Sequence, residues 1–220
     1  MNPTLKKLAK EKLPPFAVRF AKSGLSTMKY QESKRRIRRL LKEGNELLIE
    51  VGAGDKAGQN GWTTIDMTQN CDIYWDLRNG LPFPNGSVSK IYSSHFFEHL
   101  SFKETQGFLT ECQRALASGG KFMICVPNAR MYLEAYIKGI DLDPGQFFGY
   151  KPAYNHTTRI DFVNYVAYMD GEHRYMFDEE NLLYILRAKG FKNVHLRPFD
   201  PALDLKERDF ESIYAEAEKS

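Results

Sequence analysis

Cysteine is scarce in this chain and long apolar runs are absent. The first observation argues against a disulfide-stabilised protein, and the second argues against a protein with a membrane-spanning helix. The 220 residues include three cysteines, which form neither an even disulfide set nor a metal-spaced pair: Cys71, Cys112 and Cys125. Such usage is typical of a reducing compartment. No run of roughly 18 apolar residues is present, and the N-terminus lacks an apolar core followed by a cleavage site. We therefore expect a cytoplasmic protein, with peripheral membrane contact left open.

Internal repeats and low-complexity segments are also absent, so nothing indicates a repeat array. The composition is that of a globular protein, with 42% hydrophobic and 27% charged residues. A chain of this length fits one sizeable domain that buries its own core.

The charge is unevenly distributed along the chain. Residues 1–48 hold 13 Lys and Arg against 4 Asp and Glu, although the whole chain carries only +3. In the densest part, Ile37, Leu40 and Leu41 recur at helical spacing among basic residues. The favoured interpretation is a helix that packs on the domain with its basic face in solvent. An anionic membrane or a phosphorylated carrier is the alternative partner, and without an aromatic-interleaved motif we expect no nucleic acid.

Two segments follow from the patterning. Residues 1–44 are predicted as a basic helical extension, with one or two short helices that break at Pro14-Pro15 before the basic helix. Residues 45–220 alternate strands and helices, which predicts an α/β domain with a mainly parallel sheet covered on both faces. The predicted strands are 46–51, 62–66, 72–75, 88–93, 121–126, 191–196 and 212–217.

Two helices of the domain have clear ends. Ser101 and Glu104 form a capping box that opens the first, and Gly119-Gly120 is predicted to end it. Asp178 caps the second, which ends near Gly190.

Regular patterning fades over residues 129–172, where aromatic residues accumulate. A segment of this length is usually functional or carries its own helices, and aromatic rings stack on sugar faces and other flat ligands. We predict a substrate lid, with core packing of an inserted helix pair as the alternative. The candidate substrate-binding residues are Tyr132, His156 and Arg159, together with Arg174 just beyond the insert.

Acidic residues end three successive predicted strands. Glu50 leads into the turn Gly52-Ala53-Gly54, Asp66 ends the next strand, and Asp76-Leu77 ends the third. Glycines let bare backbone approach a ligand, and a carboxylate at the second strand end can accept both hydrogen bonds of a ribose diol. The pattern predicts a nucleoside cofactor.

A dinucleotide is the competing cofactor, because Gly52 to Ala57 fits a loose Gly-x-Gly-x-x-Gly/Ala pattern. Dinucleotide sites need a helix directly after the glycines to hold the pyrophosphate, and only residues 55–61 are available here. Asp66 also comes about 12 residues after the last glycine, where roughly 20 is usual. A nucleoside without phosphates fits better, and S-adenosylmethionine is the obvious one.

From about Leu47 onward the chain carries, in order, the motifs LLIEVGAG, GWTTID, DLRNGLPFPNGSVSKIYSSHFFEHL, RALASGG, KFMICVPN, HRYMFDEENLLYILRAKGFKNV and SIYAEAEK. In these it resembles class I S-adenosylmethionine-dependent methyltransferases, within them a branch associated with polysaccharide biosynthesis. The resemblance implies a single Rossmann-like domain whose seven-stranded sheet has an antiparallel last strand. It further implies cofactor contacts at the methionine end, the ribose, the adenine and the opposite wall: Glu50, Gly52, Ala53 and Gly54; Asp66 and Met67; Asp76 and Leu77; Ser93 and Ser94.

Methyl transfer to a hydroxyl needs a group that takes the proton. His95, just beyond the fourth strand, and His173, just before the late helix, are the candidate catalytic residues, with Arg174 as an anion anchor. Structural hydrogen bonding is an equal alternative for each histidine.

The run His95 to His99 also spells His-x-x-Glu-His, a zinc pattern of inverted peptidases. That chemistry needs both histidines on one helix, whereas this run follows a strand in an α/β series. We predict no metal, and expect Glu98 and His99 to hydrogen-bond the loop that holds the cofactor.

Together these observations predict a methyltransferase that acts on a hydroxyl of a sugar, glycan or glycolipid precursor. The alternatives are methylation of another small metabolite, or cofactor binding without catalysis by an interaction protein. The oligomeric state is not indicated.

Overall fold

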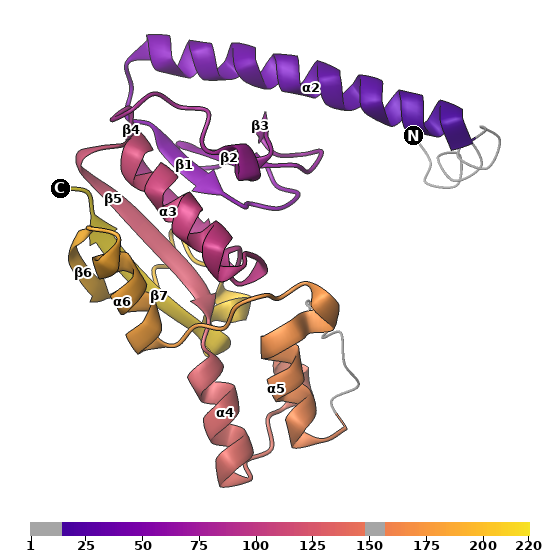
Figure 1. Cartoon of the computed structure of the whole chain (residues 1–220), viewed down its shortest axis with the longest axis vertical. Helices are drawn as coiled ribbons and strands as arrows, with labels where there is room; N and C mark the ends of the chain where they lie inside the picture. Colours follow the sequence, from indigo (N-terminus) through magenta and orange to yellow (C-terminus); the bar gives the residue numbers. More distant parts are fainter. Residues whose placement is uncertain (1–14, 148–156) are drawn as a thin grey trace.

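The computed structural model describes residues 15–147 and 157–220, and a seven-stranded sheet forms its centre (Figure 1). The strands are β1 (Leu48–Val51), β2 (Trp62–Asp66), β3 (Ile73–Tyr74), β4 (Val88–Ser94), β5 (Leu116–Pro127), β6 (Lys192–Leu196) and β7 (Ser212–Glu218), in the order β3-β2-β1-β4-β5-β7-β6. Strands β1 to β5 pair in parallel, and β7 runs antiparallel to both β5 and β6. The predicted α/β fold with an antiparallel last strand is therefore confirmed.

Two amphipathic helices pack on one face of the sheet, α3 (Phe102–Ala115) and α6 (Glu179–Ala188). The capping box at Ser101 and the Asp178 cap are both present, as predicted. The predicted end of α3 at Gly119-Gly120 is wrong, because the helix ends at Ala115. Leu116 already pairs with Val88 of β4, so the two glycines belong to β5.

The opposite face of the sheet is covered differently. Tyr92, Met123 and Tyr214 form a small core there, against which Phe199 and Leu203 pack from the loop before β7. The sheet is thus buried on both faces, which is what its predominantly parallel pairing requires.

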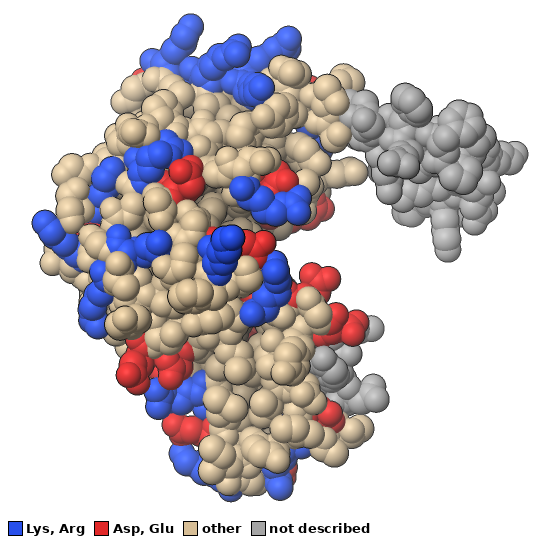
Figure 2. Space-filling view, in the orientation of Figure 1, with Lys and Arg blue, Asp and Glu red and all other residues tan. Residues whose placement is uncertain are grey.

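The basic segment forms one helix, α2 (Pro15–Glu43), along the β3 edge of the sheet (Figure 1). This continuous helix corrects the prediction of separate short helices after Pro15. Ser33 is buried and accepts the backbone N–H of Tyr74 at 2.8 Å, and Arg36 pairs with Asp72 at 3.0 Å. Figure 2 shows the lysines and arginines on the outer side of this helix. Of the helices in the described part of the chain, none has the length and apolar character to cross a membrane.

The aromatic segment forms a helical hairpin of α4 (Ala129–Lys138) and α5 (Arg159–Tyr168), which projects beyond the sheet in Figure 1. Its core is Tyr132, Phe162 and Tyr165, all buried. Most of the described aromatic rings of this segment therefore pack in the hairpin, as the packing alternative expected, while Tyr136 and Tyr168 are exposed.

Candidate active site

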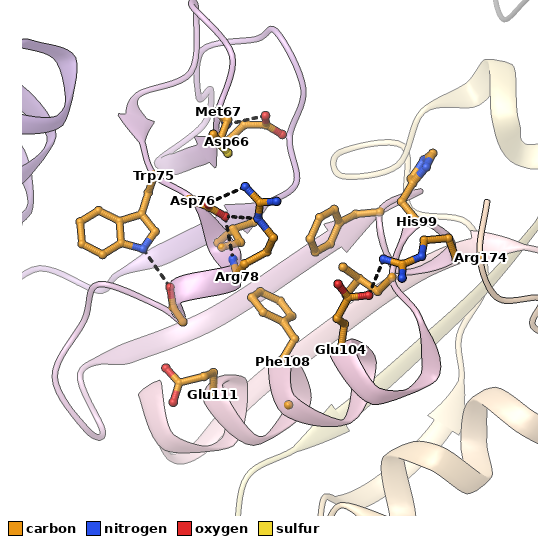
Figure 3. Close-up of a pocket in the computed structure, with 15 residues that line it drawn as sticks. Asp66, Met67, Trp75, Asp76, Arg78, His99, Glu104, Phe108, Glu111 and Arg174 are labelled. Atoms are coloured by element: carbon orange, nitrogen blue, oxygen red, sulfur yellow. Dashed lines mark hydrogen bonds and ion pairs between the residues drawn. The ribbon is translucent and has the colours of Figure 1, made fainter. Parts of the chain in front are cut away.

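A hollow of about 620 Å³ lies beyond the carboxyl ends of β2 and β3 and is closed on its far side by α3 (Figure 3). Of the predicted site residues, it brings together Asp66, Met67, Asp76, Leu77 and Arg174. Ligands of open α/β sheets bind at this edge, so the hollow is where a nucleoside is expected.

Asp66 ends β2 and closes the glycine turn. Its carboxylate accepts the backbone N–H of Gly54 at 2.9 Å and that of Met67 at 2.6 Å. Gly54 has φ +67° and open space where a side chain would lie. No helix follows the glycines, as the argument against a dinucleotide required, because residues 55–61 form bends and turns.

Gly52 is needed for a different reason. Its φ is +65°, and a Cβ there would lie 2.3 Å from the Phe96 ring. Phe96 comes from the segment after β4 and also lines the hollow. The sequence explanation for Gly52 was close approach of the cofactor, but in this structure the absent side chain makes room for Phe96.

The other residues predicted for the methionine end do not line the hollow, and neither do Ser93 and Ser94, which were predicted for the opposite wall. Glu50 is buried in β1 and pairs with Lys56 at 2.6 Å, while burial raises the pKa of its carboxyl. Ala53 donates a 3.4 Å bond to Ile65. Ser93 is fully buried at the end of β4, next to the half-buried Ser94, and its Oγ has no hydrogen-bond partner among the described residues. The residues predicted for the ribose and the adenine therefore line the hollow, whereas those predicted for the methionine end do not.

Arg78 forms an ion pair with Asp76, and both residues line the hollow. Asp76 caps the turn Leu77–Asn79 and accepts from Arg78 through Nε at 2.8 Å and Nη2 at 2.7 Å (Figure 3). The hydrogen bonds from Arg78 hold the pKa of Asp76 below its ordinary value. Asp76 thus stays charged, in a pair that a ligand has to share or displace.

The opposite wall carries Glu104, Arg174 and His99. Arg174 pairs with Glu104 at 2.6 Å, and hydrogen bonds from Ser101 and then Arg174 lower the pKa of Glu104 to about 2. His99 is half-buried and its Nδ1 lies 3.0 Å from the carbonyl oxygen of Glu172. These charged and polar groups lie across the hollow from Asp66 and Asp76, the carboxylates that are predicted to bind the nucleoside (Figure 3).

Neither predicted catalytic histidine reaches this hollow. His95 is buried with a left-handed backbone (φ 48°), and its Nε2 lies 2.8 Å from Ser212 Oγ of β7. Burial lowers the pKa of His95 well below its ordinary value. His173 is also buried, its Nδ1 lies 2.9 Å from the carbonyl oxygen of Val166, and burial lowers its pKa to about 4. Both locations fit the structural alternative for these histidines.

Glu98 differs from the expectation as well. Its side chain is buried, and neither carboxylate oxygen has a hydrogen-bond partner among the described residues, so the predicted bonds to the cofactor loop are wrong for this side chain. Burial raises the pKa of Glu98 to about 8. His99 does bond a loop, the one that contains Glu172. The run from His95 to His99 spans a strand end and a 3-10 turn, which excludes the helical geometry of the peptidase motif.

The remaining substrate candidates lie elsewhere. Tyr132 is 1% exposed and bonds the buried Glu211, so a direct contact with substrate is not supported there. Arg159 pairs with Asp141 at 2.8 Å beside a separate hollow on the hairpin. His156 lies outside the described residues.

Sequence reasoning missed several residues of the hollow, mainly Trp75, Arg78, Phe96, His99 and Phe108. Arg78 had a detectable signal, since it follows the acidic strand end by two residues. Phe108 lies on the apolar face of α3 and also lines the hollow. No sequence signal shows that this face reaches a hollow after covering the core.

Comparisons with known proteins agree on one fold. Residues 60–124, less than half of the chain, match the family model for a methyltransferase domain. No curated protein matches the sequence. Phosphoethanolamine N-methyltransferase 2 from Haemonchus contortus, in complex with S-adenosyl-L-methionine, is 14% identical with a TM-score of 0.50, and covers 80% of this chain and 49% of that one. This chain therefore spans about half the length of that enzyme.

A second solved structure is a SAM-dependent methyltransferase from Archaeoglobus fulgidus. It is 15% identical with a TM-score of 0.49, and covers 84% of this chain and 92% of that one. Likeness at such identities concerns the fold. The segment matched by the family model holds Asp66, Asp76 and His99, three residues that line the hollow.

Proposed function

We propose that this chain, an S-adenosylmethionine-dependent methyltransferase, transfers the methyl group to a hydroxyl of a sugar, glycan or glycolipid precursor. The observation that carries the proposal is the single hollow with the strand-end carboxylates Asp66 and Asp76 on one side and His99 and Arg174 on the other. Two carboxylates at successive strand ends suit a nucleoside. The polar wall opposite them suits an acceptor that presents hydroxyl groups.

Transfer from a sulfonium is a direct displacement, so the protein mainly aligns the nucleophile, the methyl group and the leaving sulfur. A hydroxyl acceptor must also lose its proton. Because His95 and His173 lie in the interior, His99 is the histidine of the described residues that lines the hollow, and we assign the contact with the acceptor to it. Methyl transfer to a hydroxyl therefore depends on the surroundings of His99.

Arg174 supports the choice of acceptor class. Its guanidinium is half-exposed beside the hollow, paired to Glu104. An arginine there can bind a phosphate of an activated sugar or of a lipid carrier, because its fork of donors matches phosphate oxygens. Exposed Tyr136 and Tyr168 on the hairpin supply rings of the kind that stack on sugars.

The cofactor half of the proposal is tested by calorimetric titration of the purified protein with S-adenosylhomocysteine, with NAD as the control. We expect affinity on the order of micromolar for the former, about −8 kcal/mol, and none for NAD. If S-adenosylhomocysteine does not bind, the proposal fails and a non-catalytic interaction protein becomes the better explanation.

The acceptor half is tested with methyl-labelled S-adenosylmethionine and a panel of sugars, nucleotide sugars, lipid-linked phosphosugars and small amines. We expect label in an ether of a hydroxylated acceptor. For a phosphorylated acceptor, Arg174→Ala should raise KM more than it lowers kcat, with the exposed Arg187→Ala as the matched control. Label only in amines would contradict the proposed acceptor.

We also propose that the outer face of α2 contacts an anionic membrane or a phosphorylated carrier. Arg35, Arg38, Arg39 and Lys42 are exposed there and Ile37 faces the domain, which leaves the charges free for a surface. Co-sedimentation with anionic and neutral vesicles tests this, using a variant with the three arginines replaced by glutamine. Equal pelleting of variant and wild type would refute membrane contact.

A further inference from the structure

Three side chains, two from adjacent residues and one from a residue 74 positions later, meet behind the wall of the hollow. Glu98 and His99 follow β4, and His173 follows the helical hairpin. One ligand atom from each lies within 4.8 Å of the others. We propose that Glu98, His99 and His173 bind one divalent transition-metal ion.

Both imidazoles have the tautomer that such a site needs. Nδ1 of His99 lies 3.0 Å from the Glu172 carbonyl, and Nδ1 of His173 lies 2.9 Å from the Val166 carbonyl. A carbonyl oxygen only accepts, so Nδ1 carries the proton in both rings and Nε2 keeps its lone pair. Metal-binding histidines almost always donate their other ring N–H in this way, which fixes the tautomer and the ring orientation.

The carboxylate supplies a second, independent observation. Glu98 is 2% exposed, and neither of its oxygens has a hydrogen-bond partner among the described residues. The nearest imidazole nitrogens lie 3.5 Å away on His95 and 4.0 Å away on His99. Burial without a hydrogen bond disfavours the charged form of a carboxylate, and a cation between Glu98 and the two imidazoles would stabilise that form.

The ligand set indicates the class of ion. Two imidazoles and one carboxylate suit zinc and its first-row neighbours, and three protein ligands are typical of catalytic sites that keep a position open. In a tetrahedral site, bonds of about 2.0–2.2 Å place ligand atoms about 3.3–3.6 Å apart. Side-chain rotations that bring the three atoms closer than their present limit of 4.8 Å are therefore needed to close the site.

The cluster borders the hollow, because His99 belongs to both. Because the cluster lies beside the hollow, the ion can take part in methyl transfer, and this role rests on the proposed function. With Nε2 of His99 bound to the ion, that imidazole would not take the proton itself; an acceptor hydroxyl at the open position would release its proton to water more readily, as metal-bound water does. The binding of the ion itself does not depend on that reaction.

The site differs from the His-x-x-Glu-His pattern in its third ligand. His95 lies beside Glu98, with its Nδ1 3.5 Å from Oε1, but it is outside the group of three residues whose ligand atoms lie within 4.8 Å of one another. His173, 74 positions after His99, replaces it. Sequence spacing therefore could not reveal the cluster.

The test uses untagged full-length protein, stripped with a chelator and titrated with Zn²⁺ against a chromophoric competitor and with Co²⁺ by absorption. We expect one equivalent per chain and tetrahedral or five-coordinate Co²⁺ bands. His173→Ala and Glu98→Gln should each weaken binding by more than the roughly 10- to 100-fold that outer-shell changes cost. His195→Ala, which removes an exposed histidine of β6, is the matched control and should bind normally.

Wild-type protein that takes up no stoichiometric ion would overturn the proposal, and so would a His173→Ala protein that binds as tightly as wild type. If His173→Ala does not fold by circular dichroism, Glu98→Gln and His99→Ala decide, since one is isosteric and the other half-exposed. S-adenosylhomocysteine is titrated into the same samples. A metal-free protein that still binds it separates failure of the metal site from failure of the proposed function.

Discussion

On the β2–β3 side of the sheet, Asp66 and Asp76 follow their strands into an open hollow, whereas beyond β4 and before β7 the acidic residues Glu98, Asp204 and Glu211 lie in the interior. These two open carboxylates accept hydrogen bonds from groups close by: Asp66 from an amide of the glycine turn and Asp76 from the side chain of Arg78. They remain available to a ligand. The acidic residues after β2 and β3 are thus open to a ligand, whereas those beyond β4 and before β7 are part of the interior.

The buried carboxylates also differ among themselves. Asp204 accepts from Tyr92 at 2.9 Å and from Arg197, and Glu211 accepts from Tyr132, whereas Glu98 has no hydrogen-bond partner among the described residues. A partnered buried carboxylate needs no other explanation. The one without a hydrogen bond is where a further ligand is expected.

The largest effect should come from Asp204→Ala. This change leaves the guanidinium of Arg197, 10% exposed, without its ion pair. Removing one partner of a buried pair costs about 3–5 kcal/mol, and urea unfolding should show a loss of that size. Glu207→Ala, an exposed acidic position in the same segment before β7, is the control and should change stability by no more than about 0.5 kcal/mol. If both variants lose the same free energy of unfolding, burial of the carboxylate does not explain the loss in Asp204→Ala.

Gly52→Ala should destabilise by about 2–5 kcal/mol, from left-handed strain of about 1–2 kcal/mol and overlap with Phe96 of about 1–3 kcal/mol. Gly54→Ala is the matched control, because it has the same strain at φ +67° and open space around it. Thermal unfolding of the pair isolates the contribution of Phe96. If both lose the same stability, the Phe96 contact does not constrain the turn.

Asp66→Asn should weaken S-adenosylhomocysteine binding by about 1.5–3 kcal/mol, the usual value of hydrogen bonds to a charged group. That is roughly 10- to 150-fold in affinity, measured by calorimetry. Asp55→Asn, which alters a pair with Asn70 in the same loop, should leave the affinity unchanged. An unaltered affinity in Asp66→Asn would remove the ribose role from this carboxylate.

The smallest effect is expected for Glu104→Gln, because its pair with Arg174 is partly exposed and such pairs contribute about 0–1 kcal/mol. The pKa of Glu104 is lowered to about 2 from 4.5, so any contribution is present above pH 4.5 and is lost as the pH falls toward 2. Urea unfolding of both proteins across this range should show a difference that shrinks with acid. A difference that grows with acid would contradict the sign.

Local patterns predicted most of the fold because they depend on neighbouring residues. The capping box at Ser101 and the Asp178 cap are contained within four residues, and strand alternation sets the sheet. The end of α3 could not be read locally. Leu116 joins β5 because β4 lies beside it, and that is a property of the sheet.

The candidate site divides in the same way. Asp66, Met67, Asp76, Leu77 and Arg174 were named from the sequence and do line the hollow, because parallel strands end at one edge. His95 and His173 were also at element ends, but packing against β7 and the hairpin buries both. Whether a residue is buried depends on the segments that pack over it, and those segments lie outside a short window of sequence around the residue.

The sequence by itself determined the order of strands and helices, the nucleoside carboxylates and the basic helix, since each follows from periodicity or from residues a few positions apart. Only the tertiary structure decided which carboxylates stay in solvent, that Phe96 fills the space at Gly52, and that His173 meets Glu98 and His99. The physical reason is that hydration and pairing are set by chain segments that are distant in sequence and adjacent in space.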